Sequence, residues 1–267
     1  MKVYLFLSLF VGFLPGLADA QKGMVESCTL SSPVVVDGNL EEWQSEWMID
    51  PKGKFLYNIC NDADNLYLRL KISDELTQRK IGLFGLSIFL NAKGKKIGKV
   101  GIRYPMAKDL EELKKETPTG QLSKAQVEEL KMGLIKDAEV LELLGLSKEP
   151  IVSPRLGLMN GLQVYIKGDD KGDFEYEAKI PFKAFRIDKA AVKVLGVAFV
   201  TGKMPPPKAQ NTTPAGGGAG NMGYARRGYG MGGMGGGMGG YGSAGYSQPS
   251  YSEWNSSTYM SVGVKLK

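Results

Sequence analysis

Asn65-Leu-Tyr-Leu-Arg-Leu-Lys-Ile72 is the stretch of the sequence that decides the fold. Apolar Leu and Ile side chains occupy every second position, while Tyr67, Arg69 and Lys71 occupy the positions between them. Residues 174–180, Phe-Glu-Tyr-Glu-Ala-Lys-Ile, repeat this alternation. A period of two is typical of a β-strand that buries one face, so both stretches are predicted to be strands of an antiparallel sheet.

Further stretches carry strand patterns of the same kind, and turn-forming residues separate several of them. Asn, Asp and Gly are frequent in residues 61–65 and 168–173, where they tolerate the backbone conformations that tight turns need. About nine strands joined by hairpins predict a mainly β protein with an antiparallel β-sandwich fold. The other predicted strands are residues 33–36, 55–60, 86–90, 99–104, 162–167, 192–201 and 258–266.

One segment, residues 108–146, breaks the β pattern because it is charged and rich in leucine. Within it, Ser123-Lys-Ala-Gln126 is a capping box that opens a helix, and Val127, Leu130 and Leu134 fall on one face of that helix. We expect a helical insertion between strands that covers one edge of the sandwich. The alternative is a pair of helices that binds a partner.

The first 20 residues are typical of a secretory signal peptide. Lys2 precedes an apolar run from Val3 to Phe13, and Ala18-Asp-Ala20 supplies the small residues of a cleavage site. The run is shorter than the roughly 20 apolar residues that span a bilayer, and no later segment comes close to that length, so no membrane span is expected. We therefore predict cleavage after Ala20 and a secreted or periplasmic mature protein.

A second departure from the β pattern, residues 204–252, divides the mature chain and is rich in Gly, Tyr and Met. Such a stretch cannot bury enough apolar surface to offset its backbone entropy, so we predict a disordered loop. Strand alternation returns after it. The predicted organisation is a sandwich in residues 21–203, this loop, and the final strand of the same sandwich within residues 253–267. Weak contacts between the loop's tyrosines can support self-association.

Composition excludes several classes of functional site. The 267-residue chain contains no histidine, so it can build neither a Ser-His-Asp triad nor a His-containing zinc site. Spacing singles out no pair among its 28 acidic residues, so we assign no catalytic residue and leave open only a glycosidase with two carboxylates. The net charge of +6 is spread along the chain, which argues against a nucleic-acid partner. No metal or cofactor is predicted.

The two cysteines of the chain are Cys28 and Cys60. In an oxidising compartment they can form one disulfide, which would close a loop of about 32 residues and stabilise the fold by roughly 3 kcal/mol. Pairing requires side chains that point toward each other, and the alternation pattern leaves that geometry open.

Three motifs carry a resemblance to a known family. Val36-Asp-Gly-Asn-Leu-Glu-Glu-Trp43 comes first, Asn61-Asp-Ala-Asp-Asn-Leu-Tyr67 lies in a predicted hairpin, and the apolar run of residues 81–91 follows. Together they resemble the family nine carbohydrate-binding modules and their DOMON-like relatives. The resemblance covers the sandwich strands and implies an elongated antiparallel sandwich that binds carbohydrate.

The resemblance also directs attention to particular residues. Asp37-Gly38 is expected to form a tight turn and Trp43 to pack at the end of the sandwich, so all three are interpreted as structural. Sugar binding in such modules depends on exposed aromatic rings that stack on a pyranose, and Trp47 and Trp254 are the candidates for such a clamp. By the same resemblance Asp62 and Asp64 could approach calcium, but the hairpin turn needs these residues anyway, so we predict no metal site.

The sequence therefore predicts a secreted, non-catalytic binding module, with a polysaccharide or cell-envelope glycan as its partner. The alternative is an envelope or matrix interaction protein. In that case the sandwich is a scaffold and the Gly/Tyr/Met-rich loop makes the contacts.

Overall fold

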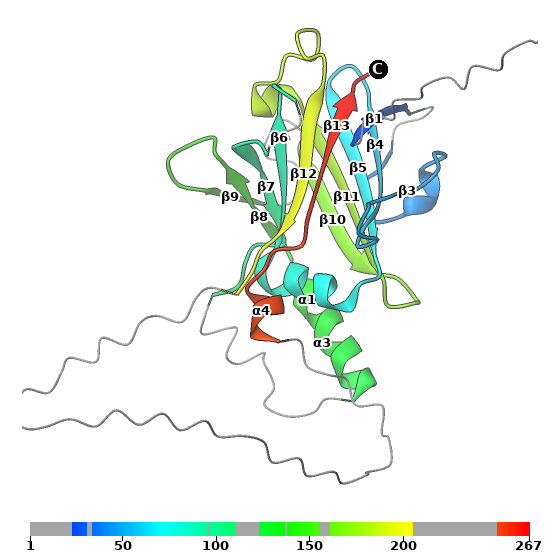
Figure 1. The fold of residues 1–267 in the computed structure, drawn as a ribbon, viewed down its shortest axis with the longest axis vertical. Coiled ribbons are helices and arrows are strands. Elements are labelled where there is room, and N and C mark those ends of the chain that lie inside the picture. Colours follow the sequence, from blue (N-terminus) through cyan, green and yellow to red (C-terminus); the bar gives the residue numbers. More distant parts are fainter. Residues whose placement is uncertain are drawn as a thin grey trace, which may run out of the picture.

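A computed structural model describes residues 23–30, 34–94, 97–109, 123–136, 138–154, 161–204 and 250–267. The signal peptide predicted in residues 1–20 lies outside these ranges, and so does nearly all of the predicted loop. Two β-sheets face each other and enclose the main hydrophobic core (Figure 1). The predicted mainly β, sandwich-like fold is confirmed.

The larger sheet has seven strands in the order β1-β13-β12-β6-β7-β8-β9. Its strands pair antiparallel, except that β1 runs parallel to β13. The bounds of these strands are β1 (Met24–Glu26), β6 (Leu86–Asn91), β7 (Val100–Tyr104), β8 (Val140–Leu144), β9 (Ile151–Pro154), β12 (Leu195–Thr201) and β13 (Tyr259–Lys265).

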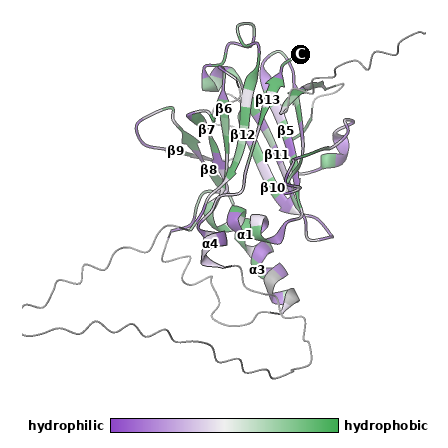
Figure 2. Cartoon of the chain, viewed as in Figure 1, coloured by the Kyte–Doolittle hydropathy of each residue, from purple (hydrophilic) through white to green (hydrophobic). Residues whose placement is uncertain are grey.

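The smaller sheet has the order β10-β11-β5-β4-β2, and β3 pairs with part of β4. The two stretches with the clearest alternation form the neighbouring strands β5 and β11, so that Arg69 lies opposite Glu177. Figure 2 shows hydrophobic and hydrophilic residues mixed along the strands, as expected when alternate side chains point into the core. The bounds are β2 (Cys28–Thr29), β3 (Met48–Ile49), β4 (Leu56–Asn61), β5 (Asn65–Ile72), β10 (Gln163–Gly168) and β11 (Phe174–Pro181).

The first two strands close one side of the sandwich. β1 pairs with β13 in the larger sheet, and β2 then pairs with β4 in the smaller sheet. Between them, the buried Ser27 donates its backbone N–H to the carbonyl of Lys265 at 2.9 Å. The chain thus crosses from one sheet to the other and covers an edge of each.

Three helices gather at one end of the sandwich: α1 (Glu75–Phe84), α3 (Lys124–Lys136) and α4 (Tyr251–Trp254) (Figure 1). The side chain of Asp74 caps α1 by accepting a hydrogen bond from the Thr77 N–H at 3.0 Å. α1 and α3 approach closely because Gly82 has no side chain: a Cβ there would lie 2.6 Å from Cβ of Leu134.

The helix predicted to open at Ser123 does so. The Ser123 N–H donates to Oε1 of Gln126 at 2.9 Å, and the Gln126 N–H donates to Oγ of Ser123 at 3.3 Å. The predicted extent of the helical insertion, residues 108–146, was wrong at its far end, since α3 ends at Lys136 and residues 140–144 form β8. The spacing of valine and leucine there fits one face of either a short strand or a helix turn, and pairing with β7 decides for the strand.

Two further expectations need correction. Residues 34–36 of the predicted strand 33–36 form no strand, because they pair with no strand of either sheet; Pro33 lies outside the described residues. Their burial still alternates, since Val34 and Val36 are buried and Val35 is exposed. At its other end, the stretch predicted to be disordered contains helix α4, which Ser250 caps by a capping box with Glu253. The final strand, β13, forms as predicted.

Cys28 and Cys60 lie opposite each other in the parallel pair β2–β4 and form a disulfide, with their Cα atoms 4.3 Å apart. Register therefore supplies the geometry that the sequence left open. The covalent ring encloses residues 34–47, which lie on the outer face of the smaller sheet.

Replacing Cys28 and Cys60 together by Ala should lower the free energy of unfolding by about 3 kcal/mol, because the bond restricts the unfolded chain. Denaturant unfolding under oxidising conditions measures the change. Wild-type protein with its disulfide reduced is the matched control and should resemble the variant. Equal unfolding midpoints for the variant and the oxidised wild type would contradict the prediction.

Candidate functional site

Residues 34–47, the opening segment, contact the outer face of the smaller sheet. Gly38 lies at φ +86°, a conformation that side chains disfavour, and it packs against Tyr165 of β10. A Cβ at this position would come within 2.7 Å of Cδ1 of Tyr165. Gly38 is therefore required both by the turn and by the close approach to the sheet.

Short polar side chains shape the turn on either side of this glycine. Oδ1 of Asp37 accepts a hydrogen bond from the Asn39 N–H at 2.7 Å. The Asn39 side chain then caps the 3-10 helix η1 (Leu40–Glu42) by accepting from the Glu41 N–H at 3.2 Å. These contacts bury Leu40 and direct the chain toward Trp43.

Glu177 on β11 fixes the opening segment to the sheet at two places. Its Oε1 accepts from Nε1 of Trp43 at 2.7 Å, and its Oε2 accepts from the N–H groups of Gly38 at 2.7 Å and Asp37 at 3.2 Å. The side chain is fully buried. Burial raises the pKa of Glu177 above its ordinary value, although the three hydrogen bonds favour the ionised form.

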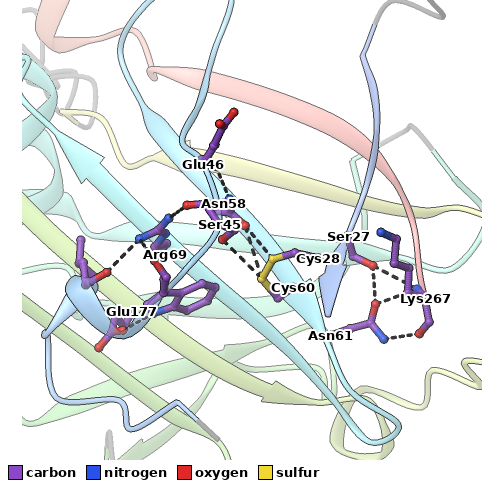
Figure 3. The surroundings of a disulfide bond; sticks show 12 residues. Ser27, Cys28, Ser45, Glu46, Asn58, Cys60, Asn61, Arg69, Glu177 and Lys267 are labelled. Carbon is purple, nitrogen blue, oxygen red and sulfur yellow. Dashed lines mark hydrogen bonds between the residues drawn. A yellow bond between two sulfur atoms is a disulfide. The ribbon is translucent and has the colours of Figure 1, made fainter. Parts of the chain in front are cut away.

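Arg69, opposite Glu177 on β5, gathers the carbonyls of the same segment. Nη1 donates to the carbonyls of Leu40 at 2.9 Å and Trp43 at 3.4 Å, and Nη2 donates to that of Ser45. Figure 3 shows this side chain beside the disulfide, with Asn58 donating to Glu46 on the same face of the sheet. Burial lowers the pKa of Arg69 to about 10, against the effect of Glu177, so it stays charged at neutral pH.

Trp47 stacks on this buried cation. The guanidinium carbon of Arg69 lies 4.0 Å from the ring centroid of Trp47 and 5.3 Å from that of Trp43. Trp47 is half-buried and lines a hollow of about 410 Å³, which we call the Trp47 hollow. Its other lining residues are Leu40, Glu41, Trp43, Ser45, Arg69, Lys71 and Glu175.

Two charged residues that line the Trp47 hollow, Lys71 and Glu175, form ion pairs with the β10–β11 turn and with β10. Nζ of Lys71 lies 2.6 Å from Oδ2 of Asp169 and 3.4 Å from Oδ2 of Asp173, and these acids raise its pKa against the effect of burial. Glu175 pairs with Lys167 at 3.6 Å. The hollow therefore combines one aromatic wall with both hydrogen-bond donors and acceptors.

Trp254 lies elsewhere, in α4 at the helical end of the sandwich. Its ring meets that of Phe84 edge-on with centroids 6.2 Å apart, and the guanidinium of Arg79 lies 4.9 Å from its centroid. Trp254 packs in the cluster formed by Leu83, Phe84 and Leu134, and it does not line the Trp47 hollow. The structure thus does not bring the two candidate tryptophans together as a clamp.

Asp62 organises the β4–β5 turn. Its Oδ1 accepts from the N–H groups of Asp64 at 2.8 Å and Asn65 at 2.6 Å, while its Oδ2 accepts from the Tyr67 hydroxyl at 2.8 Å. These hydrogen bonds lower the pKa of Asp62 against the effect of burial. Within the described ranges, no three Cys, Asp or Glu side chains are grouped so that they could hold a metal ion.

No family model, curated protein or solved structure matches this chain. The resemblance to family nine carbohydrate-binding modules is therefore carried by the motifs alone. None of the helices in the described part of the chain is long and apolar enough to cross a membrane.

Arg69 and Glu177 are the site residues that the sequence reasoning missed. Both occupy polar positions of alternating strands, which normally face solvent, and no spacing distinguishes them from Lys71 or Glu175. The one available signal was the indole N–H of Trp43, which needs an acceptor once it is buried.

Glu177 should make stability depend on pH. Its folded pKa is above the ordinary 4.5, so the stability it contributes is fully present below 4.5 and is lost as the pH rises through the folded value. Glu177→Gln does not ionise and should escape this loss. The free energy of unfolding of the variant minus that of the wild type should therefore increase as the pH rises. Denaturant unfolding at a series of pH values measures this difference. A constant difference, or a shift toward the wild type, would show that ionised Glu177 carries no such cost.

Proposed function

We propose that this chain is a secreted, non-catalytic binding module and that the Trp47 hollow takes a sugar unit of a glycan. The supporting observation is the environment of Trp47. One face of its ring lies on the guanidinium of Arg69, and Glu41, Lys71 and Glu175 line the same hollow. A ring held in this way can stack on the apolar face of a pyranose, while charged neighbours bond to its hydroxyls.

Anchoring of Trp47 supports a preformed site. Arg69 is 3% exposed and bonds to three carbonyls of the opening segment, so the ring rests on a support that is itself fixed. A rigid aromatic surface loses little conformational entropy when a ligand binds.

The role of Glu177 supports binding rather than catalysis. This buried carboxylate lies opposite Arg69 in the β5–β11 pair, and both of its oxygens already accept hydrogen bonds from the opening segment. A carboxylate used in this way holds the fold together and is not free to protonate a glycosidic oxygen.

Trp47→Ala should abolish retention of the protein on the glycan that it binds, because the stacking surface is lost. Binding is measured with a glycan array and by pull-down on insoluble polysaccharides. Trp254→Ala is the matched control, since it removes the same side chain from the helical end, and it should leave retention unchanged if the variant folds. Retention that survives in folded Trp47→Ala, or is lost in folded Trp254→Ala, would reject the Trp47 hollow as the site.

The same experiment separates binding from glycoside hydrolysis. The bound glycan should be recovered intact. Release of shortened sugars that stops in Glu175→Gln would instead identify a carboxylate-dependent glycosidase.

A second candidate function is interaction through the Gly/Tyr/Met-rich loop, and the anchoring of its two ends favours it. The backbone N–H of Met204 donates to the carbonyl of Trp254 at 3.0 Å, so residues just before and just after the segment 205–249 are joined. The two flanking residues therefore meet at the helical end of the sandwich, and neither of them lines the Trp47 hollow.

Replacing residues 205–249 by a short Gly/Ser linker should leave the sandwich folded, because the anchoring residues on both sides remain. Glycan retention should be unchanged, and any self-association should fall, as measured by pull-down and analytical ultracentrifugation. Loss of glycan retention in the folded variant would move the binding site to the loop and reject the first proposal.

A further inference from the structure

The β4–β5 turn and the chain that follows β11 lie at the end of the sandwich opposite the helices (Figure 1). Residues of both segments line a second hollow. Its volume is about 890 Å³, compared with about 410 Å³ for the Trp47 hollow. We call it the end hollow. It shares no lining residue with the Trp47 hollow.

Three cations line the end hollow: Lys183, Arg186 and Lys189. Across the described ranges, neither Lys183 nor Arg186 forms an ion pair. Lys189 donates to the backbone carbonyl of Asp62 at 3.0 Å, which leaves its charge without a neutralising partner. Such unpaired cations in one hollow favour an anionic ligand.

Two acids, Asp64 and Asp188, line the same hollow. Oδ1 of Asp188 accepts from the Ala190 N–H at 3.0 Å, so this carboxylate is partly engaged in its own turn. Three cations against two anions leave one positive charge in excess. The ligand that fits this balance carries isolated negative charges rather than a dense cluster of them.

Arg186 is the C-cap residue of the 3-10 helix η2 (Lys183–Phe185), and the backbone of this turn fixes its place in the end hollow. Its φ of 55° makes it the one non-glycine residue with positive φ in the described part of the chain. The turn holds it there: the Arg186 N–H donates to the Lys183 carbonyl at 3.2 Å, and the Ile187 N–H donates to the Phe182 carbonyl at 3.0 Å. Glycine would adopt this conformation more easily, so an arginine here is kept at a cost to the backbone.

The apolar part of the lining indicates what carries the negative charge. Pro181, Phe182 and Ile187 are buried, and Ala63 and Ala190 add small side chains. A guanidinium can hold a carboxylate through two parallel hydrogen bonds, while an apolar floor suits the face of a ring. A bare inorganic ion would leave most of the volume unfilled.

We propose that the end hollow binds an acidic sugar unit, with Arg186 holding its carboxylate and Lys183 and Lys189 adding to the field. This inference rests on the proposed function for the class of ligand, a glycan, but not for the place where it binds. The chain would then bind a glycan at two sites, with Trp47 contacting the face of one sugar ring and Arg186 holding the carboxylate of another.

The test uses oligomers of galacturonate, glucuronate and mannuronate, with their methyl esters as matched neutral probes. Affinities are measured by isothermal titration calorimetry at low and high salt. The wild type should prefer the acids to the esters, and salt should weaken that preference. Arg186→Gln should weaken binding of the acid about tenfold, because the exposed Arg186 loses its charge while glutamine keeps a neutral hydrogen-bond donor. Lys52→Gln removes the same charge from an exposed turn elsewhere and should have no effect.

Two more variants separate recognition from folding. Arg186→Gly relieves the strained backbone, so it should raise the melting temperature while it loses the affinity for the acid. Asp64→Asn removes a repelling charge and should tighten binding of the acid several-fold. Opposite signs from two substitutions in one hollow are not expected from general loss of structure.

Several results would overturn the inference. One is equal weakening by Arg186→Gln and Lys52→Gln, and another is failure of the wild type to bind any of the three acids. Loss of acid binding in Trp47→Ala but not in Arg186→Gln would place the acidic sugar at the Trp47 hollow, leaving the proposed function intact and rejecting the end hollow. Binding of inorganic phosphate through Arg186, with no binding of the sugars, would reduce the end hollow to an ion site.

Discussion

The guanidinium of Arg69 is the group on which the candidate site depends. It is buried, and it donates hydrogen bonds to three carbonyls of the opening segment. A buried cation is costly unless its surroundings supply acceptors, and a buried carbonyl is costly unless it finds a donor. Each therefore compensates for the other. From the neighbouring strand, the carboxylate of Glu177 accepts hydrogen bonds from N–H groups of the same segment.

This arrangement links packing to the proposed recognition. Trp43 donates a hydrogen bond to Glu177, and the ring of Trp47 stacks on the guanidinium of Arg69. The polar network that fixes the opening segment is thus also the support of the aromatic ring. A substitution of Arg69 or Glu177 would weaken the fold and also displace the Trp47 ring. Binding is therefore tested better at lining residues outside this network, such as Trp47 and Glu175.

The sequence predicts the strands better than it predicts what covers them. The strand bounds predicted from the alternation match those of β5 and β11 closely, because half-buried strands carry a strong period of two. The same alternation assigned Arg69 and Glu177 to a solvent face, and that assignment fails because the opening segment lies over them. Periodicity tells which side of a strand a residue is on, not which distant segment will cover that side.

Other misses have local causes. Helix α1 was not predicted, although Asp74 and Gly85 are suitable cap residues, because its apolar end runs directly into strand β6. Strands β1 and β2 have three and two residues, too few to show any period. The disulfide and the Trp47 hollow depend on register between distant strands, which a single sequence does not encode in any local pattern.

The pairing of β1 with β13 has a consequence for the time course of folding. These strands lie near opposite ends of the chain, yet they are neighbours in one sheet, and Ser27 is bonded to Lys265 and Lys267. The larger sheet cannot be completed until residues 259–265 have been synthesised, so the chain must remain without its full sheet throughout translation. Contacts of such long sequence separation form slowly.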